Sequence, residues 1–325
     1  MSERYRLIIR ETGGPEVIAR EPLAPLAPGP GEVVVRHEAI GLNYIDTYHR
    51  SGFYPLTLPS GLGSEAAGLV ERAGEESGFQ AGERVAYALA PPGAYATHRI
   101  LAADRLVRLP DDVGAETAAA AMLKGCTAEF LIERCAKVEA GDWALVHAAA
   151  GGVGSMLVPW LKAIGAGVIA HAGSAGKAAI ALGLGADHAL SCPYDALAEE
   201  VRKLTGGDGV RCVFDGVGAA SWRASLASLA RRGLMVSFGN ASGPVPPVSP
   251  LELARGGSLF LTRPTLADYV ARPEELQASA ARLFAMIRSG AVPVGIGARF
   301  ALADAAAAHR ALEGRATTGS TLLIP

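Results

Sequence analysis

The stretch Val146-His147-Ala148-Ala149-Ala150-Gly151-Gly152-Val153-Gly154 decides the fold of this chain. It comes directly after an apolar run that starts at Trp143, and it opens a segment with a helical pattern. Small residues at a strand-to-helix turn let the backbone approach a pyrophosphate, whose negative charge is attracted by the N–H groups of the helix N-terminus. Because Ala149 stands at the first glycine position of the usual pattern, a tight turn without a ligand is the alternative interpretation.

The residues after this loop alternate between short apolar strands and helices. The predicted strands cover 143–148, 167–171, 188–190, 210–214, 234–238 and 258–261, and the predicted helices cover 153–164, 177–182, 196–204 and 222–230. This alternation predicts an α/β fold with a doubly wound parallel sheet of the Rossmann type, which commonly binds a dinucleotide.

The residues before the loop have a different pattern. Strands predicted at 31–43, 66–72, 84–87 and 95–100 are separated by turns rich in Gly and Pro, and a polar loop follows the first strand. This pattern predicts a mainly β domain, on which a final apolar strand at 322–324 is expected to pack. We therefore expect one domain over 1–124, completed by about 265–325, and a nucleotide-binding domain over 125–264.

Composition argues against several other classes of protein. The 325 residues are 50% hydrophobic, with a formal net charge of −2 and no basic block, so no nucleic-acid partner is expected. The four cysteines form no C-x-x-C pair and are expected to be reduced thiols. The N-terminus lacks the apolar core of a signal peptide, and glycines and a proline interrupt the uncharged run 143–161. We therefore expect a cytoplasmic protein without a membrane span.

The end of the second predicted strand indicates the cofactor. Sites for NAD usually carry an acidic residue here, but the segment from His171 to Lys177 contains none. It offers instead the amide of Gly173, the hydroxyl of Ser174 and the ammonium group of Lys177, which suit a 2′-phosphate. The segment therefore predicts NADPH as the cofactor. The alternative is that Lys177 is merely an exposed residue in the first turn of a helix.

Five motifs stand in sequence order along the chain, over residues 41–48, 61–68, 148–154, 231–240 and 315–320. They resemble those of the zinc-free, NADPH-dependent quinone oxidoreductases (zeta-crystallin-like) of the medium-chain dehydrogenase/reductase superfamily. The resemblance implies a GroES-like catalytic domain, a Rossmann domain and a cleft between them. It also implies a homodimer joined through the edges of the Rossmann sheets.

The resemblance also implies roles for individual residues. Asn43, Asp46 and Tyr48 would line the nicotinamide and substrate cleft, and Tyr54 is a further candidate donor to a quinone oxygen. Asp46 is expected to orient its neighbours or the cofactor ribose, because a carboxylate would repel a developing oxyanion. The expected cofactor contacts are Gly151, Gly152, Val153 and Gly154 at the pyrophosphate, Gly173, Ser174 and Lys177 at the 2′-phosphate, Phe238, Asn240 and Ser242 at the nicotinamide, and Arg263 and Arg315 elsewhere.

One position departs from the family pattern. Cys192 stands where many members have a tyrosine that touches the 2′-phosphate end, and Tyr194 follows two positions later. Either Tyr194 substitutes for that tyrosine, or the contact is absent.

No metal site is expected. Zinc alcohol dehydrogenases of the superfamily use Cys and His ligands, whereas this chain has Asn43 and Asp46 in the corresponding loop, and Gly63-Ser64-Glu65 replaces a Gly-His-Glu segment. A quinone needs less activation than an alcohol, because its carbonyl groups are already electrophilic. The sequence therefore predicts an NADPH:quinone oxidoreductase that acts on a small-molecule quinone without metal.

Three alternatives remain open at this point. The nearest is an NADPH-dependent reductase of enone or alkenal double bonds, which uses the same scaffold and hydride chemistry. The second belongs to another class: a non-catalytic NADPH-binding or RNA-binding protein of the crystallin type. The third, a zinc alcohol dehydrogenase, is opposed by the missing ligands.

Overall fold

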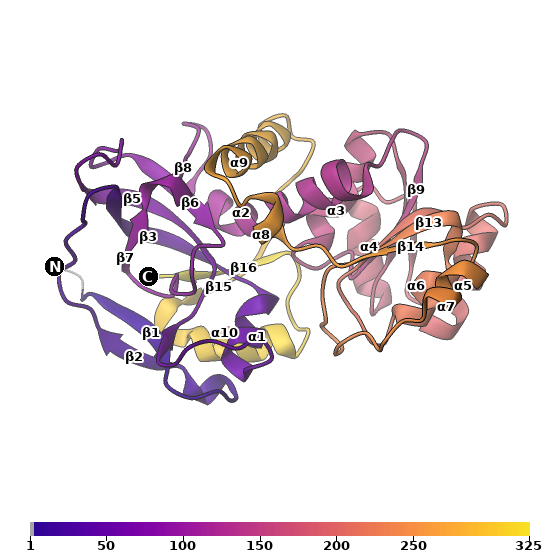
Figure 1. Ribbon diagram of the computed structural model, residues 1–325, viewed down its shortest axis with the longest axis horizontal. Coiled ribbons are helices and arrows are strands. Elements are labelled where there is room, and N and C mark those ends of the chain that lie inside the picture. The colour runs from indigo at the N-terminus through magenta and orange to yellow at the C-terminus, as the bar shows by residue number, and fades with distance from the viewer. Residues whose placement is uncertain (1–2) are drawn as a thin grey trace. The chain divides into compact units, whose positions relative to one another are not determined.

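The computed structural model describes residues 3–325, which form two compact units (Figure 1). Unit 1 contains the chain up to Cys126 together with residues 270–288 and 294–325, and unit 2 contains residues 127–269 and 289–293. The boundaries expected from the sequence lie at 124/125 and 264/265, a few residues before these junctions. Among the described residues, no helix is long and apolar enough to cross a membrane.

Unit 1 is built on a seven-stranded sheet and a smaller three-stranded sheet. The larger sheet has the order β15-β16-β3-β5-β6-β8, and β7 also pairs with β3. The smaller sheet has the order β2-β1-β4. The bounds are β1 (Tyr5–Ile9), β2 (Ala19–Pro22), β3 (Glu32–Leu42), β4 (Ser60–Gly61), β5 (Glu65–Ala73), β6 (Arg84–Ala88), β7 (His98–Ala102), β8 (Val107–Arg108), β15 (Ile296–Ala301) and β16 (Ser320–Ile324).

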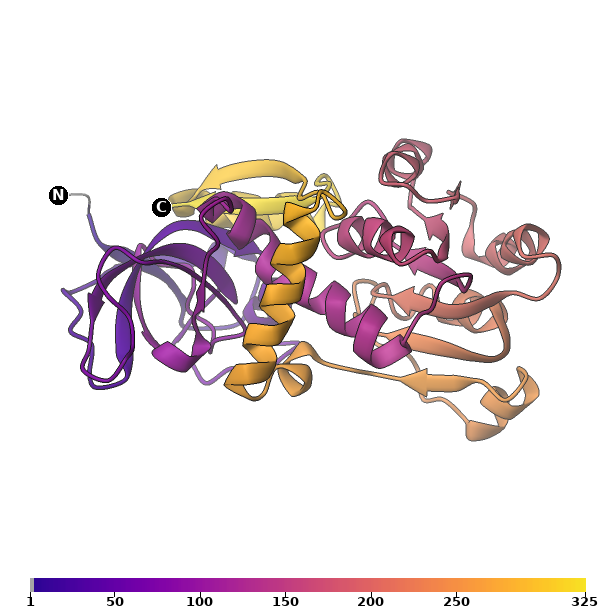
Figure 2. The same cartoon turned by 90° about the horizontal axis from the view of Figure 1, so that it is seen from above.

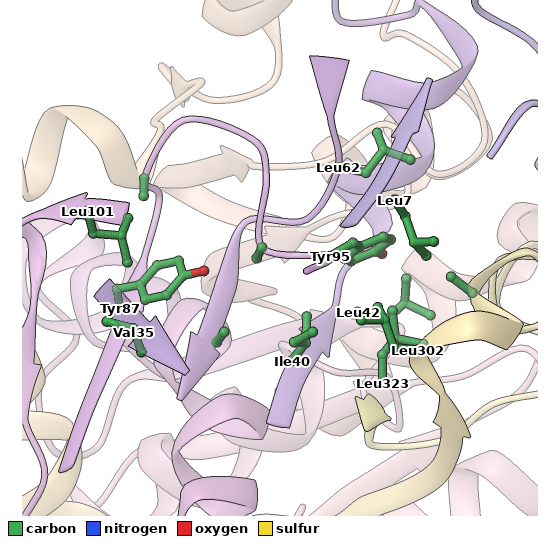
Figure 3. Close-up of a cluster of buried hydrophobic side chains, with 14 of the residues drawn as sticks. Leu7, Val35, Ile40, Leu42, Leu62, Tyr87, Tyr95, Leu101, Leu302 and Leu323 are labelled. Carbon is green, nitrogen blue, oxygen red and sulfur yellow. The ribbon is translucent and has the colours of Figure 1, made fainter. Parts of the chain in front are cut away.

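The core of unit 1 joins segments that lie far apart in the sequence. Figure 3 shows Leu7 of β1, Ile40 of β3 and Tyr95 beside Leu302 and Leu323 from the last part of the chain. The strand expected at 322–324 is the end of β16, which pairs antiparallel with β3 through residues 321–323. The C-terminal segment therefore completes both the sheet and the hydrophobic core of unit 1.

The helices of unit 1 include one that the sequence pattern did not predict. The polar stretch expected as a loop after β3 forms helix α1 (Tyr44–Ser51), so that expectation was wrong. Gly52 ends this helix at φ 80°, a left-handed conformation that favours glycine. Helix α9 (Pro273–Arg288) crosses α2 (Ala115–Glu129), as Figure 2 shows, and α10 (Ala305–Glu313) precedes β16. A 3-10 turn, η4 (Leu302–Asp304), leads into α10.

Unit 2 contains a six-stranded, entirely parallel sheet, which confirms the predicted Rossmann fold. Its order is β11-β10-β9-β12-β13-β14. The bounds are β9 (Trp143–His147), β10 (Gly167–His171), β11 (His188–Leu190), β12 (Val210–Asp215), β13 (Leu229–Ser237) and β14 (Phe260–Thr262). The π-helix η3 (Phe130–Ala136), which continues from α2, leads into this sheet.

The helices of unit 2 follow the alternation expected from the sequence, with one correction. They are α3 (Gly154–Ala163), α4 (Ala175–Gly183), α5 (Tyr194–Leu204), α6 (Trp222–Ala227), α7 (Pro250–Arg255) and α8 (Leu266–Tyr269). The helix expected over 222–230 ends at Ala227, because Leu229 already pairs with Val210 of β12. The sequence pattern did not predict α7 or α8.

Candidate active site

The strand order places the candidate cofactor residues of unit 2 along one edge of the sheet. The chain runs outward from β9 to β10 and β11, and then returns to β12 on the other side of β9. Ligands of such sheets bind at the carboxyl ends of the strands, where the order reverses. The candidates at 151–154, 173–177, 238–242 and 263 all follow the carboxyl ends of β9, β10, β13 and β14.

The glycine loop after β9 is tightly folded. Ala148 has φ 49°, and the Gly151 N–H donates to its carbonyl oxygen at 2.8 Å. A Cβ on Gly154 would lie 2.4 Å from that same oxygen, so only glycine fits there. Ala149 is fully buried and has no positive φ, which explains why alanine is accepted at the first glycine position. The Ser155 and Met156 N–H groups of α3 already donate to the carbonyl oxygens of Gly151 at 2.8 Å and Val153 at 3.0 Å. The N–H groups that would meet a pyrophosphate are therefore those of Gly152, Val153 and Gly154, at the start of the helix.

The loop after β10 has space for a further anionic group. Gly173 and Ser174 are exposed, and a Cβ on Gly173 would meet no atom within 4 Å. Ser174 begins α4 by accepting a hydrogen bond from the Lys177 N–H at 3.3 Å. A hydroxyl group, a backbone amide and an ammonium group thus come from three neighbouring positions. This set fits a phosphate better than a ribose hydroxyl.

The loops after β12 and β13 are bonded to each other. Ser242 donates from its hydroxyl group to the Val217 carbonyl at 2.8 Å and accepts from the Ala220 N–H at 2.9 Å. In the orientation that satisfies its amide, Asn240 accepts from Arg263 Nη2 at 3.2 Å, and Arg263 Nη1 donates to the Ser237 carbonyl at 2.9 Å. The Ser242 hydroxyl group is therefore engaged with the neighbouring loop. The ring of Phe238 lies against Gly216, and a Cβ placed on Gly216 would lie 3.0 Å from this ring.

A buried polar network, which the sequence did not predict, supports the loops that follow β12 and β13. Asp215, the last residue of β12, accepts from the hydroxyl groups of Ser221 and Ser225, both at 2.6 Å, and from the Val217 N–H at 2.7 Å. Because Ser225 gives its one hydroxyl proton to Asp215, it accepts from His147 Nε2, 2.9 Å away. Burial lowers the pKa of His147 to about 4, so the ring is neutral at pH 7. The sequence signal for this network was an acidic residue, Asp215, at the end of an apolar strand.

Tyr194 lies among aromatic rings at the ends of β9 and β10. Its ring centroid is 5.0 Å from that of His171 and 5.8 Å from that of His147. His171 Nε2 donates to the Cys192 carbonyl at 2.9 Å. At this edge of the sheet, Cys192 therefore contributes its backbone and Tyr194 contributes its aromatic ring.

In unit 1, Asp46 is fully buried and surrounded by donors. Its carboxylate accepts from the Asn43 N–H at 2.9 Å, from the Ser64 hydroxyl group at 3.0 Å and from the Tyr95 hydroxyl group at 3.0 Å. Burial raises the pKa of Asp46 to about 6, although these hydrogen bonds act in the opposite direction. This geometry suits the expected role of orienting neighbours.

A chain of hydrogen bonds leads from the surface of unit 1 to Asp46. Arg50 pairs with Glu313 at 2.7 Å and also lies 3.1 Å from His309 Nδ1. Arginine has no acceptor, so Nδ1 accepts, and the proton of neutral His309 is on Nε2, which donates to the Tyr95 oxygen at 3.0 Å. Tyr95 then donates to Asp46, so every bond from Arg50 inward points towards Asp46, whereas Arg50 donates outward to Glu313. The sequence carried no local signal for it.

A buried ion pair holds Asn43. Its Nδ2 donates to Glu65 Oε1 at 2.7 Å and to the Gly41 carbonyl at 3.4 Å. Glu65 also accepts from Lys124 Nζ at 2.7 Å, and both charged side chains are buried. The amide hydrogens of Asn43 therefore point into unit 1. Tyr48 and Tyr54 are therefore the better donors to a bound substrate. The Gly63-Ser64-Glu65 segment was the sequence signal for Glu65.

Tyr48 and Tyr54 are brought together at the end of α1. The Tyr54 N–H donates to the Tyr48 carbonyl at 3.1 Å, and the two ring centroids are 5.1 Å apart. Both side chains are half-buried. The remaining candidate of unit 1, Arg315, is exposed just after α10.

In residues 3–325, no group of three or more His, Cys, Asp or Glu side chains is arranged to hold a metal ion. The four cysteines are free thiols, and Cys126 and Cys212 are buried. The candidate residues themselves carry hydroxyl groups, amides and charged side chains.

Two family models and several known proteins match this chain. The alcohol dehydrogenase GroES-like domain matches residues 29–111, and the zinc-binding dehydrogenase model matches residues 152–285. The quinone oxidoreductase of Pseudomonas aeruginosa is 50% identical over 96% of this chain and 97% of that protein. The crystal structure of Escherichia coli quinone oxidoreductase complexed with NADPH has a TM-score of 0.96 at 44% identity, covering 99% of this chain and 100% of that one. The 2-haloacrylate reductase of a Burkholderia species is 40% identical over 98% of each chain.

Proposed function

The chain belongs to the quinone oxidoreductase family of the medium-chain dehydrogenase/reductase superfamily, and on that premise we propose that it reduces quinones with NADPH. The observation that carries the choice of cofactor is the open, acid-free loop after β10, with Gly173, Ser174 and Lys177. The relative of known structure that was solved with NADPH supports the same choice.

The residues of this chain fit NADPH at each of its charged groups. Residues 151–154 would hold the pyrophosphate, because the loop is closely folded and opens onto the N-terminus of α3. Gly173, Ser174 and Lys177 would hold the 2′-phosphate. Phe238, Asn240 and Ser242 would contact the nicotinamide side, with Arg263 and Arg315 as further contacts. NADPH, when bound, supplies the hydride.

The protein's own part in the reaction is binding, orientation and stabilisation of charge. As a quinone accepts hydride, negative charge develops on its oxygen, and the hydroxyl groups of Tyr48 and Tyr54 are the donors that would stabilise it. Asn43 and Asp46 would act as positioning residues, because the hydrogen bonds of both point into unit 1. The metal-free mechanism rests on the electrophilic character of the quinone carbonyl groups.

Two further properties are proposed together with this function. Exposed Phe260 and Leu261 on β14, the edge strand of the sheet, and exposed Leu251 on α7 favour a homodimer joined through these edges. Free thiols at all four cysteines fit a reducing compartment, which supports a cytoplasmic location.

A second candidate function is the reduction of an activated carbon–carbon double bond. The identity to the 2-haloacrylate reductase favours it as the alternative. Oxidation of NADPH should be followed with a panel of quinones, enones and haloacrylates. We expect the quinones to give the highest kcat/KM. A preference for enones or haloacrylates would reverse the order of the two candidates, and oxidation of NADPH with no acceptor on the panel would indicate a non-catalytic protein.

A further inference from the structure

Lys124 is a buried cation of unit 1 that has hydrogen-bond donors to spare. Arg50 and Lys124 are the arginine and lysine side chains that are buried in residues 3–325, and Arg50 already donates to four acceptor atoms. The ammonium group of Lys124 carries three donors, and Glu65 Oε1 is the one acceptor that the described part of the chain offers it, 2.7 Å from Nζ. We propose that Lys124 is a further catalytic residue, which donates to the quinone oxygen on which negative charge develops. This inference rests on the proposed function.

The ammonium side of the buried ion pair is the side that a ligand can reach. The side chain of Lys124 is 5% exposed, whereas that of Glu65 is fully buried. Donors enclose the Glu65 carboxylate, because Oε1 also accepts from Asn43 Nδ2 at 2.7 Å and Oε2 accepts from the Leu123 N–H at 2.6 Å. A substrate oxygen would therefore meet the N–H groups of Lys124 and not the carboxylate, which would repel it.

Lys124 lies beside residues of the candidate site. Its Nζ and Asn43 Nδ2 bond to the same oxygen of Glu65, so the ammonium group is adjacent to the residue that begins α1, the helix that carries Tyr48. Gly41 explains how α2, which carries Lys124, comes so close to β3. A Cβ on Gly41 would collide with Glu65 Oε1 and with a carbonyl oxygen of α2. The fold therefore holds the ammonium group at a fixed position next to Asn43.

The proposed reaction benefits from positive charge at this position. A quinone that accepts the hydride of NADPH becomes a hydroquinone anion, and a proton from water then completes the hydroquinone. The negative charge develops on an oxygen, and a preorganised ammonium group stabilises it more than a neutral hydroxyl group does. Lys124 therefore adds a charged donor to the hydroxyl groups of Tyr48 and Tyr54. Glu65 balances the charge of Lys124 before the substrate binds.

The variants that test this inference separate the ammonium group from its partner. Lys124→Met alone would leave the Glu65 carboxylate buried without a counterion, which destabilises a fold. The main variant is therefore Lys124→Met/Glu65→Gln, in which the new amide oxygen can still accept from Asn43. Glu65→Gln alone keeps the ammonium group. Lys162→Met/Asp187→Asn is the matched control, because it removes a lysine–carboxylate pair of 2.8 Å from unit 2.

The probe is para-nitrophenol, because its anion resembles a hydroquinone anion and has an absorption band that the neutral phenol lacks. Dissociation constants of phenol and phenolate should be measured on the protein loaded with NADP⁺, whose own charge is the same in every variant. We expect the preference for the phenolate to be about tenfold smaller in Lys124→Met/Glu65→Gln than in the unmodified protein. Glu65→Gln and the control should keep the preference. In single turnovers, Lys124→Met/Glu65→Gln should slow hydride transfer to a quinone by about thirtyfold, with NADPH affinity unchanged.

The outcomes separate the role of Lys124 from the proposed function. The role would be overturned if the unmodified protein bound the phenolate no more tightly than the phenol, whether or not the variants fold. An unchanged preference in Lys124→Met/Glu65→Gln would also overturn it. So would a loss of the preference in Glu65→Gln, because the ammonium group is still present there and the loss would come from altered surroundings of Asn43. If the protein preferred the phenolate through Lys124 but reduced no quinone, Lys124 would remain an anion-binding residue and the proposed reaction would be wrong.

Discussion

Tyr95 donates a hydrogen bond of 3.0 Å to Asp46, and both side chains are fully buried in unit 1. The direction of this bond is fixed by His309, which donates to the Tyr95 oxygen because Arg50 occupies its other ring nitrogen. Asp46 is thereby held from three sides by donors, at the start of the helix that carries Tyr48. A buried carboxylate in this setting positions α1 and makes the stability of the protein sensitive to pH.

The first prediction concerns that pH dependence. Burial raises the pKa of Asp46 from 3.8 to about 6, so between these values the folded protein keeps a proton that the unfolded chain has released. The free energy of unfolding should therefore fall as the pH rises through this window. Asp46→Asn removes this contribution. In urea titrations, the difference between the two proteins should change by about 2 kcal/mol between pH 4 and pH 7. Asp104→Asn, at an exposed carboxylate, controls for the loss of charge, and a constant difference would contradict the prediction.

The second prediction concerns the choice of cofactor. Lys177 is the candidate cation for the 2′-phosphate, and a charge-assisted hydrogen bond contributes roughly 1.5–3 kcal/mol. The unmodified protein should bind NADPH more tightly than NADH, and Lys177→Ala should narrow the ratio of the dissociation constants by about tenfold. Lys203→Ala, at an exposed lysine of α5 that pairs with Glu199 and Glu200, should leave the ratio unchanged. Equal affinity for both cofactors in the unmodified protein would refute this assignment.

The third prediction compares two glycines. A Cβ on Gly154 would lie 2.4 Å from the Ala148 carbonyl oxygen, so Gly154→Ala must displace the glycine loop. We expect it to abolish measurable NADPH binding in a fluorescence titration. A Cβ on Gly183, in α4, would meet no atom within 4 Å. Gly183→Ala should therefore keep cofactor affinity and stabilise the fold by about 0.4–1 kcal/mol. If Gly154→Ala bound NADPH normally, cofactor binding would not require the close packing of residue 154 against the Ala148 carbonyl oxygen.

The fourth prediction concerns metal. No ligand cluster of three or more His, Cys, Asp or Glu side chains exists among residues 3–325, although one matching family model is described as a zinc-binding dehydrogenase. Purified protein should contain no stoichiometric zinc in elemental analysis, and a chelator should leave quinone reduction intact. One zinc per chain that is removed together with activity would be evidence for a ligand set outside the usual pattern.

The fifth prediction concerns Tyr48. If its hydroxyl group donates to the quinone oxygen, Tyr48→Phe removes one donor and keeps the ring in its aromatic cluster. Turnover under conditions where hydride transfer limits the rate should fall by about tenfold, which corresponds to about 1.4 kcal/mol, with NADPH affinity nearly unchanged. An unaltered rate with every quinone would remove Tyr48 from the reaction and leave Tyr54 as the remaining candidate.

The parallel sheet of unit 2 could be predicted from the sequence because its central strands β9 and β10 are short runs of buried, mainly apolar residues that alternate with helices. The hydrogen-bonded chain from Arg50 to Asp46 could not, since Asp46, Tyr95 and His309 come from distant segments and each looks like an isolated polar residue. Helix α7 had a local signal that was overlooked: Ser249 caps its N-terminus, and a proline stands at its first position.

Some misses have a simple physical cause. The segment after β3 is polar, and it has no apolar periodicity that would predict a helix. It nevertheless forms α1, because the Asp46 carboxylate accepts a hydrogen bond from the Asn43 N–H at the start of the helix. The helix expected over 222–230 was too long, because pairing with Val210 recruits Leu229 into a strand. In both places a hydrogen bond or strand pairing made by the backbone outweighs the local sequence pattern.

The pairing of β16 with β3 also sets an order of events during synthesis on the ribosome. Ile40, Gly41 and Leu42 emerge early, yet their partners in β16 leave the ribosome only after the whole of unit 2. At the usual speed of translation this delay is on the order of tens of seconds. Unit 2 can complete its sheet during that interval, while the nascent first unit waits with an open strand edge that other chains could pair with. The usual order, in which the N-terminal unit folds first, would then be reversed, and we expect the unfinished first unit to be most prone to aggregation before its last strand is made.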